Sequence, residues 1–168
     1  MAWTIDNSHS EVGFNVRHMM ISTVRGSFHK FSGAVDFNEA DPVASKVDVT
    51  IDVTSVDTRD EKRDGHLKSP DFFDAEKFPS MTFKSTKVEK TSDTTGKLHG
   101  ELTIKGVTKP VTLTVTHFHS MPHPMLKKDA IGANASTKVK RSEFNMGKNV
   151  PYVGDEITLT IAVEAIKE

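Results

Sequence analysis

Apolar and polar side chains alternate along most of this chain. The alternation runs over residues 11–17, 47–53, 98–105, 111–116, 131–139 and 157–164. Successive side chains of a β-strand point to opposite faces of its sheet, so a period of two predicts strands with one apolar and one wet face. Wet outer faces are typical of antiparallel sheets rather than of parallel sheets covered by helices. The pattern therefore predicts an all-β, antiparallel protein.

Turn-forming residues separate the alternating runs. They lie at Ser92–Gly96, Lys105–Pro110, Pro122–Pro124 and Pro151–Gly154. Gly33 interrupts the apolar stretch Phe31–Phe37, which predicts a bend or bulge where the sheet curls. Seven or eight strands in one domain form a sandwich or a barrel. Because the apolar phase persists through nearly every long strand, we expect one domain over residues 1–168, folded as an eight-stranded barrel.

One segment breaks the alternation. Thr58-Arg59-Asp60-Glu61 has the Thr-x-x-Glu form of a capping box and predicts a helix through about Leu67. Ser69-Pro70-Asp71 is suited to start a second helical turn. We therefore expect a short helical region around residues 58–74 that plugs or covers one end of the barrel. The phenylalanines that accompany it are Phe72, Phe73 and Phe78.

The composition excludes several classes of protein. The 168 residues suit a single domain. Because 22 Lys and Arg nearly balance 23 Asp and Glu, the chain lacks the positive charge of a general nucleic-acid binder. The absence of cysteine removes disulfides, thiol nucleophiles, cysteine zinc sites and iron–sulfur clusters.

The N-terminal residues carry no recognisable targeting signal. Met1–Asp6 lacks the basic and apolar stretches of a signal peptide. No run approaches the ~18 apolar residues of a membrane-spanning helix. We expect a cytoplasmic protein without a transmembrane segment, or a periplasmic or secreted one if a signal peptide has been removed.

The aromatic residues are nearly all phenylalanine, with 10 Phe against 1 Trp and 1 Tyr. The interior of an eight-stranded barrel is either filled by side chains or holds one small ligand. Small inward residues such as Gly100, Ala133 and Ala135 leave volume, whereas interdigitation of large and small residues fills it, and the pattern leaves both open. Apolar walls, with Met19 and Met20 as an adaptable rim, suit a long apolar molecule.

Two groups of histidines are candidate metal ligands. The groups are His117, His119 and His123, and His66 with Asp57, Asp60 and Asp64. The first has no nearby carboxylate apart from Asp129, and the carboxylates of the second suit helix capping. We therefore expect no metal site.

The densest polar cluster beside apolar sequence contains Asp57, Arg59, Asp60 and His66. The chain has no Gly-x-Ser-x-Gly motif and no phosphate-binding loop, so we expect no catalytic residue and no enzyme. One alternative stays open, an enzyme acting on a lipid-like substrate with Asp57 and His66 as its acid–base pair.

The chain resembles the YceI family of bacterial lipid-binding proteins along almost its whole length. The shared motifs are Trp3–Ser10, Val12–Phe14, His18–Ser22, Arg25–Phe28, Asp57–Arg59, His66-Leu67, Asp71–Asp74, Pro79 with Thr82-Phe83, Gly100–Thr108, Arg141 with Phe144, and Val153–Asp155. Several independent motifs in the same order make the resemblance specific.

The resemblance implies a lipocalin-like barrel that holds a long amphiphile. It implies a polyisoprenoid ligand, such as an isoprenoid quinone or a prenyl phosphate, or in some members a fatty-acid derivative. It also implies a homodimer and no established catalysis. No further cofactor is expected, because the bound lipid or quinone is itself the ligand.

We expect the lipid tail and its polar head to contact different residues. The residues expected to line the tail are Phe14, Val16, Met19, Met20, Val49, Ile51, Phe72, Phe73, Phe83, Leu102, Ile104, Leu113, Ile131 and Ala133. Those expected at the head are His18, Arg59, His66 and Arg141. Arginine suits a phosphate through its fork of donors, whereas a quinone needs only neutral hydrogen bonds.

Overall fold

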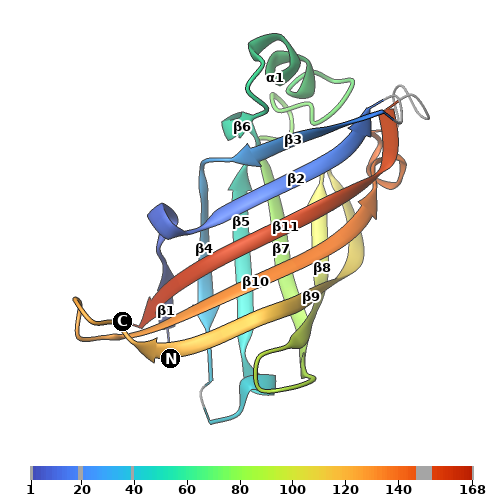
Figure 1. Cartoon of the computed structure of the whole chain (residues 1–168). Coiled ribbons are helices and arrows are strands. Elements are labelled where there is room, and N and C mark those ends of the chain that lie inside the picture. Colours follow the sequence, from blue (N-terminus) through green and yellow to red (C-terminus); the bar gives the residue numbers. More distant parts are fainter. Residues whose placement is uncertain (1, 19–20, 39, 147–152, 168) are drawn as a thin grey trace.

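A computed structural model describes residues 2–18, 21–38, 40–146 and 153–167, with the backbone alone at Ala2, His18, Pro42 and Val153. Strands make up most of it (Figure 1). They are β1 (Ala2–Ile5), β2 (Glu11–His18), β3 (Ser22–Phe28), β4 (Phe31–Asp36), β5 (Lys46–Asp52), β6 (Val56–Asp57), β7 (Ser80–Lys90), β8 (Gly96–Ile104), β9 (Val107–Pro122), β10 (Asp129–Lys140) and β11 (Val153–Lys167). The helical elements of the described part are α1 (Glu61–Leu67) and the 3-10 turns η1 (Asn7–His9), η2 (Pro42–Ala44), η3 (Val53–Ser55) and η4 (Arg141–Phe144). No helix among the described residues is long and apolar enough to cross a membrane.

The strands form one antiparallel sheet that closes on itself. The sheet runs in the order β1-β4-β5-β7-β8-β9-β10-β11, and β1 also pairs with β11, which completes an eight-stranded barrel. Along the rest of β11 lies β2, followed by β3 and β6. Each alternating run of the sequence falls in one of these strands, so the expected antiparallel barrel is confirmed.

The apolar phase of each strand faces the interior. Ala133 and Ala135 of β10, for example, lie opposite Val163 and Ile161 of β11. The buried core gathers side chains from most strands and from η4. Its members are Ile5, Val12, Phe28, Phe31, Ile51, Val53, Val56, Ala75, Met81, Phe83, Leu102, Ile104, Leu113, Phe144 and Met146.

Two phenylalanine rings lie directly over glycines. A Cβ atom added at Gly26 would lie 2.4 Å from Cζ of Phe14, and one added at Gly100 would lie 2.5 Å from Cζ of Phe83. The expectation that Gly100 leaves free volume is therefore wrong, because the Phe83 ring occupies that space. These positions follow the interdigitated packing of large and small residues.

Replacing Gly100 by alanine is expected to lower the free energy of unfolding by about 1–3 kcal/mol, the usual effect of overpacking. The new methyl group would meet the Phe83 ring and the backbone oxygen of Lys84, both at 2.5 Å. Gly132→Ala is the matched control, since its nearest contact is Val163 O at 3.9 Å. Urea denaturation of the two variants checks the difference, and equal stabilities would contradict this packing.

The bulge expected at Gly33 is absent from the pairing of β4 with β5. The pairing of β4 with β5 runs through Gly33 without a shift of register. A Cβ at this position would lie 2.7 Å from Asp48 O, so the glycine permits close approach of the neighbouring strand. Register shifts lie instead at Ser85/Lys87, at Asn134/Ala135 and at Val153/Ile157.

The helix begins two residues later than the capping-box pattern predicts. Asp60 is the N-cap, and its carboxylate accepts hydrogen bonds from the N–H groups of Lys62 and Arg63. Thr58 is buried, and its hydroxyl donates to Asp64 Oδ1 at 2.6 Å and accepts from Arg63 Nε at 2.9 Å. The predicted end at Leu67 is correct, but residues 68–74 form turns rather than a second helix.

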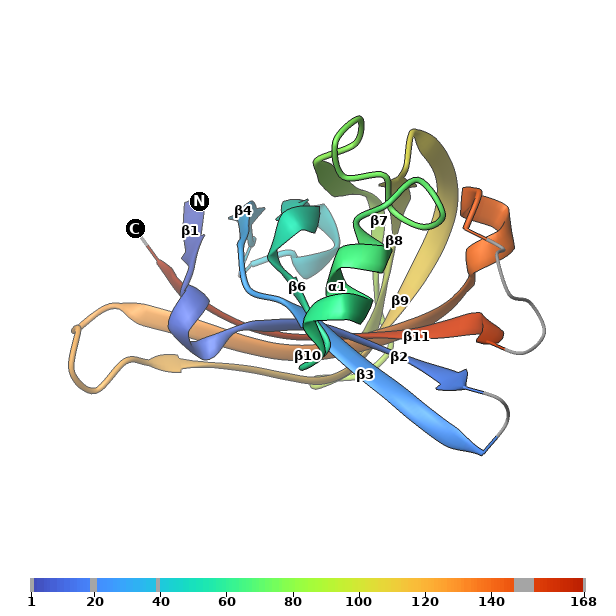
Figure 2. The same ribbon diagram turned by 90° about the horizontal axis from the view of Figure 1, so that it is seen from above.

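Helix α1 and the turns after it lie at one end of the barrel (Figure 2). The Phe73 ring packs edge-on against Phe28 of β3, with 5.8 Å between centroids. Lys105, in the β8–β9 turn, donates from Nζ to the carbonyl oxygens of Pro70 and Asn145. Helix α1 and the turns after it, residues 61–78, which we call the cover segment, are therefore tied both to the barrel core and to the segment after η4.

A second apolar cluster closes the end where the two termini lie (Figure 1). Trp3, Ile131 and Ala165 are buried there, and Phe37 and Phe118 pack against them. Trp3 Nε1 donates to Phe37 O at 3.3 Å, which satisfies its polar group.

Candidate functional site

Most of the residues predicted to contact the lipid tail face the barrel interior. Five of them are buried in the main core, namely Ile51, Phe83, Leu102, Ile104 and Leu113. Phe14, Val49 and Phe73 are partly buried and pack against that core. Seven of these eight positions lie on β2, β5, β7, β8 and β9, where they give the barrel an apolar wall, and Phe73 lies in the turns after α1.

The other predicted tail residues have different surroundings. Val16 is buried outside the two clusters, and Ile131 belongs to the Trp3 cluster. Phe72 is buried beside α1 rather than inside the main core. Ala133 faces the interior and is half-buried. Met19 and Met20 lie outside the described residues.

Several apolar residues face inward yet keep exposed surface. They share the strand phase of the buried core but are only half-buried: Val35, Leu98, Val111, Ala135, Val139, Leu159, Ile161 and Val163. Side chains that fill a close-packed interior retain little exposed surface. Together with Ala133 they form a partly exposed apolar lining. Leu98, Val111, Leu159, Ile161 and Val163 are absent from the predicted tail site, although the same alternation identifies them.

Arg141 is buried at the α1 end of the barrel, with 5% of its surface exposed. Its Nε donates to Gly154 O at 2.8 Å and its guanidinium also donates to Met146 O. The guanidinium carbon lies 5.8 Å from the centre of the Phe72 ring. Burial lowers the pKa of Arg141, while the charge of Asp155 opposes that shift. Arg141 thus joins η4 to the start of β11 and packs on the cover segment.

The other predicted head residues each have different surroundings. His66 bonds through Nε2 to Asp71 Oδ2 at 2.9 Å, and its ring packs edge-on against Phe72. Arg59 is exposed and has a left-handed backbone, with φ of 66°. The side chain of His18 lies outside the described residues. His66 and Arg141 therefore both contact the Phe72 ring.

The acid–base pair that the alternative enzyme requires does not form. Asp57 bonds instead to His29, with 3.0 Å between Oδ2 and Nε2, and accepts from the N–H of Arg59 at 2.9 Å. Since His66 is bonded to Asp71, the two groups have separate partners. These bonds lower the pKa of Asp57, chiefly through the Arg59 N–H and then His29.

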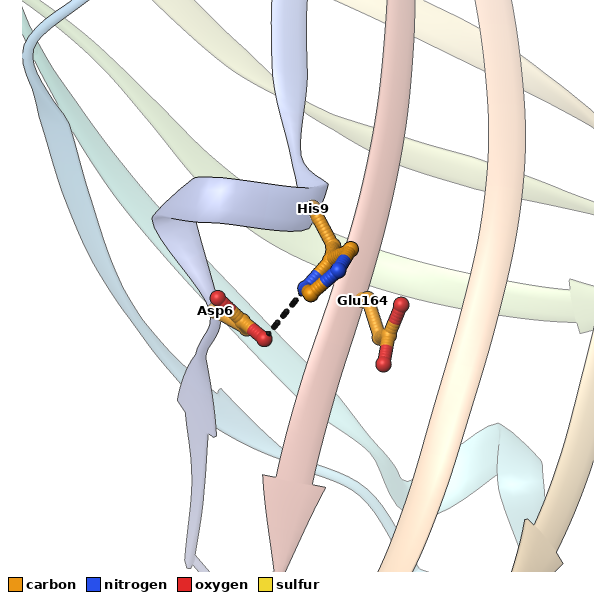
Figure 3. Close-up of side chains that lie close together, drawn as sticks. All are labelled: Asp6, His9 and Glu164. Atoms are coloured by element: carbon orange, nitrogen blue, oxygen red, sulfur yellow. Dashed lines mark hydrogen bonds and ion pairs between the residues drawn. The ribbon is translucent and has the colours of Figure 1, made fainter. Parts of the chain in front are cut away.

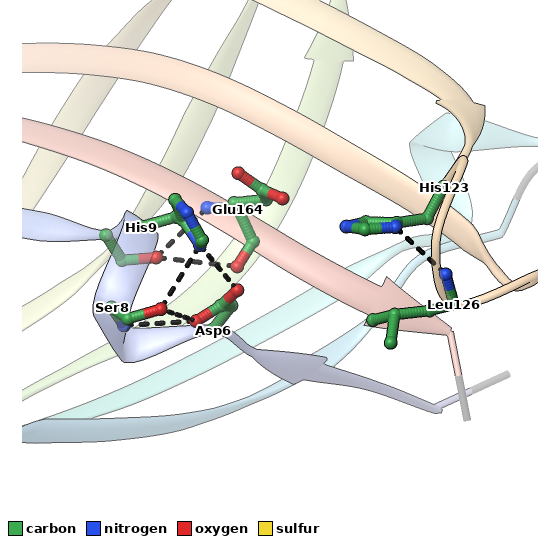
Figure 4. Close-up of polar contacts among 7 residues, drawn as sticks. Asp6, Ser8, His9, His123, Leu126 and Glu164 are labelled. Atoms are coloured by element: carbon green, nitrogen blue, oxygen red, sulfur yellow. Dashed lines mark hydrogen bonds and ion pairs between the residues drawn. The ribbon is translucent and has the colours of Figure 1, made fainter.

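Among the histidines of β9 and its loop, His117 and His119 lie side by side, with 4.2 Å between their ring centroids. His117 and His119 are both exposed, on the outer face of β9. Nδ1 of His123 accepts hydrogen bonds from the N–H groups of Met125 and Leu126, which shapes the β9–β10 loop (Figure 4). These contacts give His123 a structural role in its own loop.

Asp6, His9 and Glu164 are a group of the described residues that could hold a metal ion, with ligand atoms within 4.8 Å of one another. They gather where η1 crosses β11 (Figure 3). Asp6 Oδ2 bonds to His9 Nδ1 at 2.8 Å, and Asp6 Oδ1 accepts from Ser8. Ser10 adds hydrogen bonds to the Glu164 backbone. These hydrogen bonds hold the β1–β2 corner to β11.

The Asp6–His9 pair predicts a pH dependence. Hydrogen bonds from Ser8 and then His9 lower the pKa of Asp6 from 3.8 to about 2, so its contribution to stability is present above pH 3.8 and is lost as the pH falls towards 2. The Asp6 carboxylate raises the pKa of His9, so the contribution of the His9 charge to stability is full below pH 6.5 and is lost as the pH rises through the pKa of His9 in the folded protein.

An NMR titration of the His9 ring is expected to show the raised pKa. Asp6→Asn returns it to the ordinary range, whereas the remote Asp93→Asn leaves it raised; an unchanged titration in Asp6→Asn would refute the pairing.

Comparisons with known proteins agree with this architecture. The model of the YceI-like domain family matches residues 3–165. Protein YceI of Escherichia coli O157:H7 is 39% identical over 163 residues, covering 97% of this chain and 84% of that protein. A crystal structure of Burkholderia cenocepacia BcnA superposes with a TM-score of 0.85 at 29% identity, covering 95% of this chain and 98% of the other.

Two further solved structures share the fold. A Campylobacter jejuni YceI protein superposes with a TM-score of 0.80 at 37% identity, covering 90% of each chain. A polyisoprenoid binding domain from Saccharophagus degradans superposes with a TM-score of 0.72 at 12% identity, covering 99% of this chain and 98% of the other. At that identity the second likeness concerns the fold alone.

Proposed function

Because this chain belongs to the YceI-like domain family, we propose that it binds a long-chain isoprenoid lipid in the barrel interior and carries or stores it. The observation that carries the proposal is the half-buried apolar lining of a closed barrel. The fold is compatible with this class of ligand, because a polyisoprenoid binding domain from Saccharophagus degradans shares it.

The chemistry of the lining suits a hydrocarbon tail. Burying each methylene group contributes roughly 0.8 kcal/mol, so a tail of many carbons needs few polar contacts. The phenylalanine rings of Phe14, Phe73 and Phe83 have no polar group that needs a partner. An isoprenoid quinone or a prenyl phosphate fits this lining, and a fatty-acid derivative is the alternative.

The polar head is proposed to lie at the α1 end, where Phe72 contacts both His66 and Arg141. His66 is about half exposed there and is oriented by Asp71. Binding without catalysis is part of the proposal, because Asp57 and His66 have separate partners.

Titration of delipidated protein with an isoprenoid quinone, a prenyl phosphate and a fatty-acid amide tests the proposal. Native mass spectrometry is expected to detect saturable uptake of one isoprenoid molecule for each barrel, and no uptake of the quinone ring without its tail. A barrel that takes up none of the three lipids would contradict the proposed function. Sedimentation of the same samples measures whether the protein is the homodimer that the family resemblance implies.

A further inference from the structure

The wall of the barrel opens between β9 and β10. These strands pair from Asp129↔Pro122 to Ser136↔Thr114. Beyond that point, residues 107–113 pair with β8 and residues 137–140 pair with β11, but the two segments do not pair with each other. All residues of both segments are described. We call this unpaired stretch the seam, and in Figure 2 the upper part of β9 curls away from β10 beside it.

A cavity of about 360 Å³ lies at the seam. Val111, Val139 and Phe144 line it, and all three belong to the apolar cluster of the barrel interior. The rim is charged, with Lys109, Lys138, Lys140, Glu143 and Glu156. The cavity therefore lies between a charged rim and apolar side chains of the barrel interior.

The turn η4 closes the inner side of this cavity. Phe144 is only 1% exposed and is among the largest fully buried side chains. The neighbouring Ser142 holds η4 to β11, because its N–H and its hydroxyl donate to the two carboxylate oxygens of Asp155 at 2.8 and 2.7 Å. The Phe144 ring, which we call the plug, thus lies between the rim and the interior. The two hydrogen bonds from Ser142 to Asp155, which we call the latch, hold η4 in this position.

The geometry points to a lateral entry port. We propose that the lipid enters and leaves the barrel through the seam, with Phe144 as the plug and the Ser142–Asp155 contact as the latch. The proposal rests on the proposed function and adds the route that the ligand takes. A lateral route suits an amphiphile, because its head stays at the charged rim while its tail passes over Phe144 into the interior.

A cross-link across the seam tests the port directly. The chain contains no cysteine, so Thr112→Cys with Lys138→Cys places two unique thiols on the two sides of the seam. A short cleavable bismaleimide is expected to slow quinone uptake by at least about tenfold, and cleavage is expected to restore the rate. The same linker between Thr114→Cys and Ser136→Cys is the matched control, because these residues are already paired and closing them changes nothing.

The latch gives a second, independent measurement. Ser142→Ala removes the hydroxyl bond to Asp155 and is expected to release bound quinone about tenfold faster, since a hydrogen bond to a charged group has that order of strength. Ser92→Ala, in the remote β7–β8 turn, is expected to leave the release rate unchanged.

The outcomes separate the port from the proposed function. Unchanged uptake after seam cross-linking, with normal affinity at equilibrium, would overturn the port and leave the lipid-binding proposal intact. Unmodified protein that binds no quinone would overturn both. Slower uptake with unchanged affinity, together with faster release by Ser142→Ala, supports the port.

Discussion

Replacing Ala133 by tryptophan is expected to abolish lipid binding and to leave the barrel folded. Ala133 faces the interior from β10, opposite Val163 of β11 and Phe118 of β9, and is half-buried. An indole at this position occupies the space that the tail requires. We expect the affinity for an isoprenoid quinone to fall by about a hundredfold, which equals about 2.7 kcal/mol of binding free energy.

The thermal stability of Ala133→Trp distinguishes a hollow barrel interior from one filled by side chains. In a hollow barrel the indole replaces the ligand, and the midpoint of thermal unfolding changes little. In a filled barrel it overpacks the core and costs about 1–3 kcal/mol of stability. Asn134→Trp is the matched control, since this neighbour is exposed on the outer face. An affinity that is unchanged in Ala133→Trp would contradict the assignment of the tail site.

Replacing Phe28 by alanine is expected to destabilise the protein more than the other substitutions considered. Phe28 is 3% exposed, and its ring centroid lies 5.6 Å from that of Phe14 and 5.8 Å from that of Phe73. It therefore packs β3, β2 and the cover segment together. Removing such a ring costs about 3–5 kcal/mol.

Urea denaturation measures this loss as a lower midpoint with an unchanged slope. Phe78→Ala is a suitable control, because Phe78 belongs to the cover segment that Phe28 contacts but is only half-buried. We expect it to cost clearly less than Phe28→Ala. Equal losses for the two variants would mean that the ring cluster around Phe28 does not hold the cover in place.

The strands could be predicted from the sequence because their signal is local. A period of two fixes which side chains share a face, and a slip of one residue would turn the apolar face of a strand to water. For that reason the inward positions of β8, β10 and β11 follow directly from the alternation. The turn Lys105-Gly106 is equally local, since both residues have positive φ, of 53° and 75°.

Packing between distant segments could not be predicted in the same way. Gly100 looks like free space until the ring of Phe83 is placed over it. Thr58 has the pattern of an N-cap, but the fold buries it, so its hydroxyl bonds to Asp64 while Asp60 caps the helix. Local sequence preferences allow either Thr58 or Asp60 to cap the helix, and contacts within the fold determine that Asp60 does so.

In the candidate site, the tail residues could be predicted from the sequence, whereas the contacts of the polar residues could not. Tail residues such as Leu102 and Ile104 were identified because burial of an apolar face follows from the strand phase. The partners of polar side chains depend on which loops meet, so the sequence did not predict the bond between His66 and Asp71 or the carbonyls that hold Arg141. The seam could not be predicted from the sequence either, because β9 and β10 each continue beyond their mutual pairing as strands paired with β8 and β11.

Native mass spectrometry of the protein as isolated, followed by solvent extraction and lipid identification, tests the central claim most directly. We expect a reproducible adduct of one isoprenoid lipid for each barrel in the unmodified protein and in Asn134→Trp, and its loss in Ala133→Trp. A barrel that is reproducibly empty of lipid, and that stays empty when isoprenoid quinone is added, would contradict it.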